Sequence, residues 1–141
     1  MFQKILVPVD FTAKNDAALA AASDTAAAAA ERAEVTLLHV IETIEHIEFD
    51  EMADFYRKLE TRAAAKLAVM TERMGAAGVR ARSEILFGHR AESIVRCAKE
   101  LPADLLVLSS HRVDPHAAGR GWGTLSYRVA VVADCPVLLV K

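Results

Sequence analysis

The sequence predicts an α/β fold of the doubly wound type, with a five-stranded parallel sheet and helices on both faces. Two observations predict it. Short apolar runs alternate with helical stretches along the chain, and several of these runs are apolar at nearly every position. Strands that are buried on both faces of a sheet have this continuous pattern, whereas strands with one solvent-exposed face alternate apolar and polar residues. Because 141 residues suit one hydrophobic core, we expect a single domain over residues 1–141.

The strands are expected where the apolar runs lie. The most continuous runs are residues 5–7, 105–108 and 137–140, which should be interior strands or become so on assembly. The five expected strands are residues 4–9, 35–40, 79–86, 104–109 and 136–140.

An alanine-rich stretch, residues 13–32, is expected to form the first helix, with Thr12 available as its N-cap. The small side chains would let this helix lie close to the sheet. Residues 90–100 predict a third helix that Pro102 stops, and residues 124–132 predict a fourth.

The second expected helix, residues 44–74, has an amphipathic pattern, because its apolar residues recur at steps of three and four. Phe55 and Leu59 belong to this apolar stripe, and we interpret them as core packing rather than as part of a cofactor site. Gly75 and Gly78 are expected to end the helix.

Charge and hydropathy exclude several classes of function. A formal net charge of -2 and an isoelectric point near 6.2 indicate no basic surface for nucleic-acid phosphates, so no nucleic-acid partner is expected. No segment approaches the roughly 20 consecutive apolar residues that span a bilayer. The first residues have too short an apolar run for a signal peptide. We therefore expect no membrane partner and a cytoplasmic location.

Cys97 and Cys135 stand apart from each other, and no cluster of cysteine and histidine has metal-ligand spacing, so we interpret them as structural thiols. The histidines have no zinc-binding spacing, and we expect no metal held by protein ligands. His39 lies on an expected buried strand and is interpreted as a packed core residue.

In a doubly wound fold, ligands bind outside the carboxyl ends of the strands, where the strand order reverses. Asp10 closes the first expected strand, where a carboxylate can accept hydrogen bonds from a ribose or from an adenine amino group. Asp is also common at such positions as a turn residue or a cap. Both interpretations of Asp10 stay open.

The segment 108–124 is the most informative part of the sequence, because it leaves an apolar strand and enters a helix. Gly119, Gly121 and Gly123 would let the main chain approach a ligand closely. Thr124 opens the last helix, where free N–H groups and the helix dipole suit a phosphate.

No enzyme motif is visible. Ser109, Ser110 and His111 are adjacent, but neighbouring side chains at a strand end point in different directions, so they do not form a nucleophile and base. There is no G-x-S-x-G elbow and no Walker lysine. We expect no enzyme, or at most slow ATP hydrolysis. A hydrolase or nucleotidyl transferase on the same fold is the least favoured alternative.

Five stretches along the chain together resemble the universal stress protein family. They are ILVPVD (5–10), LHV (38–40), FGHRAESI (87–94), ADLLVL (103–108) and CPVLLV (135–140). The resemblance implies the strand order 3-2-1-4-5, and it implies that the domain binds adenine nucleotide, either ATP or AMP, with Mg²⁺ accompanying ATP. It also implies a small regulatory module in the stress response.

The family's nucleotide-binding loop reads Gly-x2-Gly-x9-Gly-(Ser/Thr), and this chain matches it in part. Asp10 and Val40 match the positions that hold ribose and base, and Gly123-Thr124 matches the closing pair. Ser109 and Arg112 stand where the two leading glycines are expected, and ten residues instead of nine separate Arg112 from Gly123. The expected ligand-binding residues are Pro8, Val9, Asp10, Val40, Ser109, His111, Arg112, Arg120, Gly121, Gly123, Thr124, Leu125 and Ser126.

Two consequences of the altered loop compete. Arg112 and Arg120 could replace backbone amides with charge, since a guanidinium pairs well with phosphate oxygens. Alternatively the loop has lost its phosphate path, and the chain is a dimeric scaffold that binds a protein partner and no nucleotide.

Residues 136–140 are too apolar for an edge strand left in water. We expect a homodimer joined through this last strand, and the resemblance implies the same, with the two copies antiparallel across a two-fold axis. The alternative is that Lys141 and a covering helix protect the edge.

Overall fold

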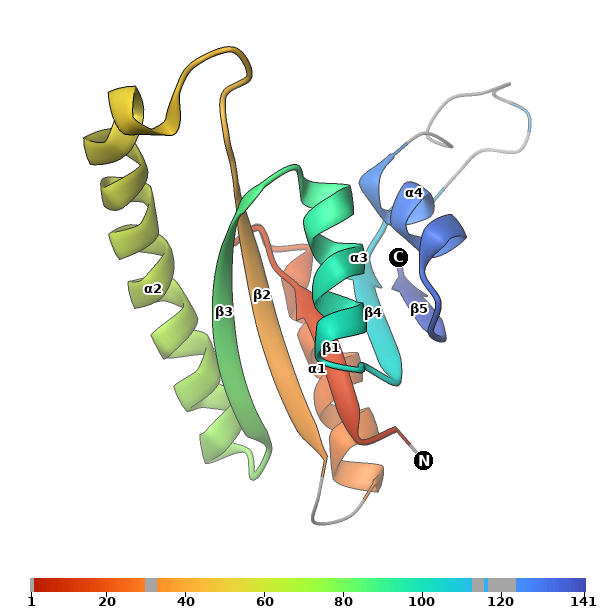
Figure 1. Ribbon diagram of the computed structural model, residues 1–141. Coiled ribbons are helices and arrows are strands. Elements are labelled where there is room, and N and C mark those ends of the chain that lie inside the picture. The colour runs from red at the N-terminus through yellow and green to blue at the C-terminus, as the bar shows by residue number, and fades with distance from the viewer. Residues whose placement is uncertain (1, 30–32, 113–115, 117–123) are drawn as a thin grey trace.

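A computed structural model describes residues 2–29, 33–112, 116 and 124–141. Its five strands form one parallel sheet in the order β3-β2-β1-β4-β5, as predicted (Figure 1). The strands are β1 (Lys4–Pro8), β2 (Glu34–Glu42), β3 (Arg80–Gly88), β4 (Leu105–Ser109) and β5 (Val137–Val140). The helices are α1 (Asn15–Ala28), α2 (Ala53–Ala76), α3 (Arg90–Glu100) and α4 (Leu125–Val132), with a 3₁₀ turn, η1 (Phe49–Met52), before α2.

Helices cover both faces of the sheet, and each face has its own core. On one face α1 and α2 pack against alternate residues of the strands, among them Ile5, Val35 and Val107. On the other face α3 and α4 pack against the residues between these, such as Leu6 and Leu106. The central strands β1 and β4 are therefore buried on both sides, which accounts for their continuous apolar pattern.

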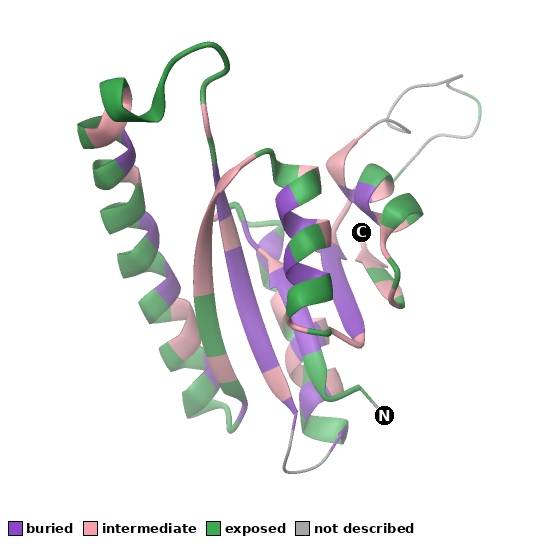
Figure 2. Ribbon diagram, in the orientation of Figure 1, coloured by how far each residue is buried: buried purple, intermediate pink, exposed green. Residues whose placement is uncertain are grey.

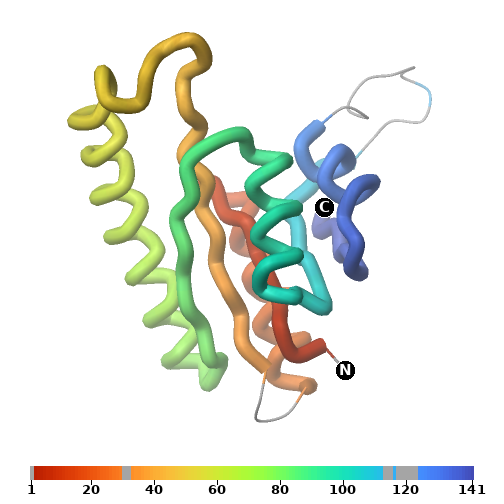
Figure 3. The backbone as a smooth tube through the Cα atoms, viewed as in Figure 1, coloured from red at the N-terminus to blue at the C-terminus, as the bar shows by residue number. Residues whose placement is uncertain are grey.

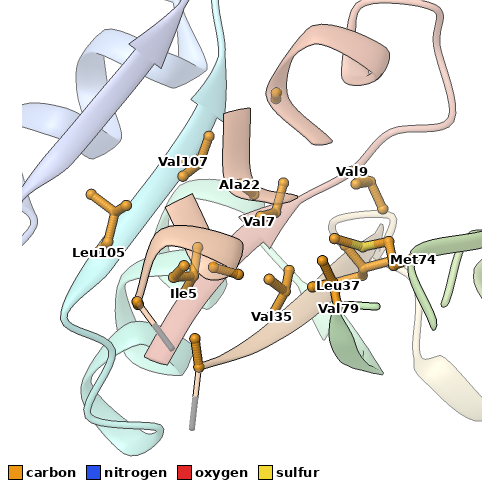
Figure 4. Close-up of a cluster of buried hydrophobic side chains, with 14 of the residues drawn as sticks. Ile5, Val7, Val9, Ala22, Val35, Leu37, Met74, Val79, Leu105 and Val107 are labelled. Carbon is orange, nitrogen blue, oxygen red and sulfur yellow. The ribbon is translucent and has the colours of Figure 1, made fainter. Parts of the chain in front are cut away.

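The first core depends on small side chains in α1. Ala18 and Ala22 are fully buried in this core, and in Figure 4 Ala22 lies next to Val7 of β1. A larger residue at these positions would hold the helix farther from the sheet. The expectation that alanine lets this helix lie close to the sheet is confirmed.

The start of α1 differs from the prediction. The helix begins at Asn15, and Thr12 is not its N-cap, because the Thr12 hydroxyl and amide both donate to Asp10 Oδ1 at 2.7 and 3.0 Å. The end expected at residue 32 lies outside the described residues, and α1 itself ends at Ala28.

The second helix also begins later than predicted, at Ala53, and it ends at Ala76, so Gly75 lies within its last turn instead of ending it. Gly78, at φ 83°, follows the C-cap and closes a Schellman motif in which its amide donates to Gly75 O and the Val79 amide donates to Met74 O. The interpretation of Phe55 as core packing is wrong: its ring is exposed, and Tyr56, one residue later, is the buried aromatic of this helix.

Ala22→Leu should destabilise the protein by about 1–3 kcal/mol, because the larger side chain would enter the core at a position that is fully buried. The free energy of unfolding, measured by urea denaturation, checks this. Ala17→Leu, at an exposed position of the same helix, is the matched control and should change the free energy by much less. Equal effects of the two substitutions would contradict the close packing of α1.

Candidate functional site

A cleft of about 290 Å³ lies at the carboxyl ends of β1, β2 and β4, where the strand order reverses. Residues of the turn from β1 to α1, the start of α3 and the start of α4 also line it. Nine of the residues expected from the sequence line this cleft: Pro8, Val9, Asp10, Val40, Ser109, His111, Thr124, Leu125 and Ser126.

The remaining expected residues are placed differently. Arg112 is exposed and is not among the residues that line the cleft. Arg120, Gly121 and Gly123 lie outside the described residues.

Asp10 faces the cleft and also shapes the turn that leads into α1. Its Oδ1 accepts hydrogen bonds from the amide and the hydroxyl of Thr12. Partial burial acts to raise the pKa of Asp10, but the two bonds from Thr12 and the charge of Arg90 outweigh it, so the pKa is lowered overall. Asp10 is therefore an ionised carboxylate at neutral pH. It both accepts the hydrogen bonds that shape the turn and lines the cleft.

Asn15 holds this turn to the end of β4. Its Oδ1 accepts the amides of Asp10 and Phe11 at 3.0 and 2.9 Å, and its Nδ2 donates to Ser109 Oγ at 3.0 Å. The side chain is only 3% exposed. Phe11 has a φ of 66°, which is unfavourable for a bulky side chain, and the bond from its amide to Asn15 helps to hold it there. Sequence reasoning missed Asn15, because an Asn near a helix start is usually a local cap.

The polar residues after β4 join this strand to α4. Ser110 Oγ and Ser126 Oγ lie 2.9 Å apart, and His111 Nε2 lies 3.0 Å from Thr124 Oγ1. The hydroxyl of Tyr127 donates to the carbonyl of His111 at 2.8 Å. Ser109 and Ser110 thus point to different elements, as expected from their adjacent positions, and the bonds described for His111 go to neither serine.

The interpretation of His39 as a packed core residue is wrong. Its ring is half-buried, lines the cleft and lies 4.3 Å from the Phe11 ring, between centroids. Its Nδ1 is 2.8 Å from the carbonyl oxygen of Val9. Because a carbonyl can only accept, Nδ1 carries the hydrogen. Burial lowers the pKa of His39, against the opposing effect of the Val9 carbonyl, so the ring is neutral at pH 7.

Two cationic side chains in the cleft, Lys14 and Arg90, were not singled out from the sequence. Arg90 opens α3 directly after β3, and its Nε lies 3.5 Å from Glu42 Oε1. A signal was present in the sequence, since both cations follow the carboxyl end of a strand. Lys and Arg are so common on helix surfaces, however, that position alone does not mark them as ligand contacts.

The cysteines and the residue types that bind metals form no second site among the described residues. Burial raises the pKa of Cys97 to about 12, with a further contribution from Glu84, and burial also raises the pKa of Cys135. Both cysteines are free. Within the described part of the chain, no three His, Cys, Asp or Glu side chains are grouped closely enough to hold a metal ion.

The family model for the universal stress protein family matches residues 1–141. The chain belongs to the universal stress protein family. Its five-stranded sheet and helices have the arrangement of solved universal stress proteins. No curated protein sequence matches the chain significantly. Among the described residues, no helix has the length and apolar character needed to cross a membrane.

Three solved structures illustrate the likeness. Hypothetical protein MJ0577 is 26% identical with a TM-score of 0.83, and the match covers 100% of this chain and 96% of that one. The Archaeoglobus fulgidus universal stress protein in complex with dAMP is 19% identical, with a TM-score of 0.69 and coverage of 99% and 98%. A universal stress protein in complex with cAMP is 22% identical, with a TM-score of 0.71 and coverage of 99% and 97%. Because the dAMP-bound and cAMP-bound proteins are less than 25% identical to this chain, their similarity to it shows a shared fold and no more.

The pKa of His39, followed by NMR of its ring protons, should lie below its ordinary value of 6.5. Since the folded pKa is the lower one, the unfolded chain binds this proton more readily. The stabilising contribution is therefore present above pH 6.5 and is lost as the pH falls through the folded pKa. A titration midpoint at or above 6.5 would contradict the hydrogen-bonded, half-buried placement of the ring.

Proposed function

We propose that this universal stress protein is a small regulatory module that binds an adenine nucleotide, ATP or AMP, in the cleft and acts in the stress response. The observation that carries the proposal is the meeting of Asp10, Val40 and the start of α4 around one cavity at the switch point of the sheet. The dAMP and cAMP complexes of two proteins with this fold support an adenine nucleotide as the ligand.

The cleft offers suitable groups for each part of such a ligand. The carboxylate of Asp10 can accept hydrogen bonds from ribose hydroxyls, and Val40 offers an apolar contact to a base. The amino end of α4, with Thr124 as its N-cap residue, suits the phosphate end. Thr124 is bonded to His111, so a phosphate that used its hydroxyl would have to share or replace this bond.

Charge for the phosphates could come from either of two sets of residues. The sequence pointed to Arg112 and Arg120, whereas Lys14 and Arg90 line the described cleft. We place Lys14 and Arg90 beside the nucleotide and retain Arg112 and Arg120 as groups that would approach from the loop after β4. Any Mg²⁺ would arrive with ATP and be held mainly by its phosphates.

Among the described residues that line the cleft there is no assembled nucleophile and base, and we expect no enzyme activity beyond slow ATP hydrolysis. A cytoplasmic location belongs to the same proposal. The second candidate function is a dimeric scaffold that binds no nucleotide. The bond between His111 and Thr124 favours it, because this bond already occupies the hydroxyl that a phosphate would use.

Millimolar ATP or AMP should raise the melting temperature of the protein, and Asp10→Ala should weaken the affinity at least about tenfold, because a hydrogen-bonding carboxylate is lost from the cleft. Differential scanning fluorimetry with a nucleotide titration measures both. Asp10→Asn, which keeps an oxygen for Thr12, separates loss of the ligand contact from loss of the turn.

Asp24→Ala, at an exposed position of α1 away from the cleft, is the matched control and should bind as the wild type does. An unchanged melting temperature in both nucleotides would reject nucleotide binding and leave the scaffold. Wild-type affinity in Asp10→Ala would remove Asp10 from the site without rejecting the ligand.

We further propose a homodimer joined through β5, which is an edge strand of the sheet. Val137 and Leu139 pack toward α3 and α4, whereas Leu138 is 40% exposed. The ammonium group of Lys141 lies over the Tyr127 ring, 5.9 Å from its centroid, and so is directed toward α4. An apolar edge strand of this kind favours pairing with a second copy.

Leu138→Lys should shift the protein from a dimer toward the 15.3 kDa monomer, because pairing would bury the added charge without a partner. Light scattering after size exclusion measures the mass. This position is better than Val137 or Val140, whose side chains pack in the protomer's own cores. Val69→Lys, at an exposed apolar position on α2, is the control. A wild-type mass near 15.3 kDa would reject the dimer.

A further inference from the structure

The connection from β2 to α2 extends beyond the sheet and carries an unusual surface. In Figure 3 it arches at the end of the molecule away from β5, and Figure 2 shows it as almost wholly exposed. It continues β2 and lies beside β3, which is at the opposite edge of the sheet from β5. Neither the proposed nucleotide site nor the proposed dimer accounts for this surface.

Large apolar side chains are exposed along this connection. Ile44, Ile47, Phe49 and Phe55 are each 40% to 46% exposed, and all fall within a stretch of twelve residues, 44–55. We call these four residues the apolar tip. Single exposed apolar residues are ordinary on protein surfaces, whereas several gathered in one place mark an interaction site.

The apolar tip is organised around Tyr56, which is almost fully buried. The Phe49 ring stacks on the Tyr56 ring with centroids 4.8 Å apart, and the Phe55 ring lies 5.6 Å from it. The Tyr56 hydroxyl accepts the amide of Ile44 at 2.8 Å. Phe87 at the end of β3 supports Phe49 edge-on, at 5.4 Å. These contacts hold Ile44, Phe49 and Phe55 in place before any partner binds, which lowers the entropic cost of docking.

Acidic side chains surround the apolar tip. Residues 42–54 contain six carboxylates and no Lys or Arg: Glu42, Glu45, Glu48, Asp50, Glu51 and Asp54, all of them exposed. Glu42, Glu45 and Asp54 lie near Arg90, His89 and Arg57, respectively. For Glu48, Asp50 and Glu51 the described residues provide no ion pair, so these carboxylates are available to a partner.

The negative charge around the apolar tip indicates which kind of partner can bind there. Six carboxylates around an apolar centre would repel the anionic surface of a membrane. A partner that buries the tip must offer apolar side chains and present cations to the rim, as the two faces of a basic amphipathic helix do.

We propose that the apolar tip and its acidic rim form a docking surface for a basic amphipathic helix of a partner protein. The helix lays its apolar face on Ile44, Ile47, Phe49 and Phe55, and its Lys and Arg side chains pair with Glu48, Asp50 and Glu51. Because the surface is distinct from the cleft, docking does not require nucleotide. The rim meets the cleft through the contact between Glu42 and Arg90, so the two sites are adjacent.

The test uses the full chain and a fluorescein-labelled amphipathic peptide of leucine and lysine, about 15 residues long so that it can form a helix. Fluorescence anisotropy should show binding that weakens with salt. Ile47→Ser/Phe55→Ser and, separately, Glu48→Lys/Glu51→Lys should each reduce the affinity at least about tenfold. Phe49 is left unchanged because its ring stacks on Tyr56. If Ile47→Ser/Phe55→Ser lowers the melting temperature, the affinity of Glu48→Lys/Glu51→Lys is the result that tests the proposal.

Three controls make the result specific. Val131→Ser/Val132→Ser removes the exposed apolar residues of α4 and should leave the affinity within about twofold of the wild type. A peptide of the same composition in a non-amphipathic order, and a peptide of leucine and glutamate, should bind much more weakly. Equal affinity in the wild type and both tip variants would overturn the proposal. So would binding to vesicles of anionic phospholipid that the tip variants abolish, since the surface would then be a membrane contact.

Discussion

The two central strands of this protein must be covered on both faces, and most of the architecture follows from that constraint. β1 and β4 are apolar at successive positions, so each presents hydrophobic side chains to both sides of the sheet. The helices divide accordingly, with α1 and α2 on one face and α3 and α4 on the other. In β1 and β4 the polar side chains, Lys4 and Ser109, stand at the ends of the strands, and the cleft forms at the carboxyl ends.

The cleft depends on a small set of bonds between elements that are far apart in the sequence. Asn15 joins the turn after β1 to Ser109 at the end of β4, and Ser110 and His111 join the same strand to α4. These bonds satisfy polar groups that would otherwise be buried without partners. Asp10 and Val40, on which the proposed nucleotide site rests, both line the cleft that these bonds border.

The nucleotide cleft, the β5 edge and the apolar tip lie in different parts of the molecule. β5 and β3 are opposite edges of the sheet, and the apolar tip is beside β3. A ligand, a second copy and a protein partner would thus not compete for the same residues. The contact between Arg90 and Glu42 is the short connection from the cleft to the rim of the apolar tip.

The sequence by itself determined the layers of this protein and the general place of its site. Continuous apolar runs indicate a parallel sheet covered by helices on both faces, and ligands bind at the carboxyl ends of such strands. Family resemblance supplied the strand order, which local patterns do not contain. Asp10 and Thr124 could be named for the same reasons, since both stand at the boundary of an element.

Only the tertiary structure decided which polar groups meet and which aromatic residue is buried. The periodicity of α2 allowed either Phe55 or Tyr56 to face the core, because neighbouring residues differ by only about 100° around a helix. The contacts with Phe49 and Phe87 decided for Tyr56. Asn15, Lys14, His39 and Arg90 entered the site through the folding of separate segments onto one another, and no short-range pattern records that information.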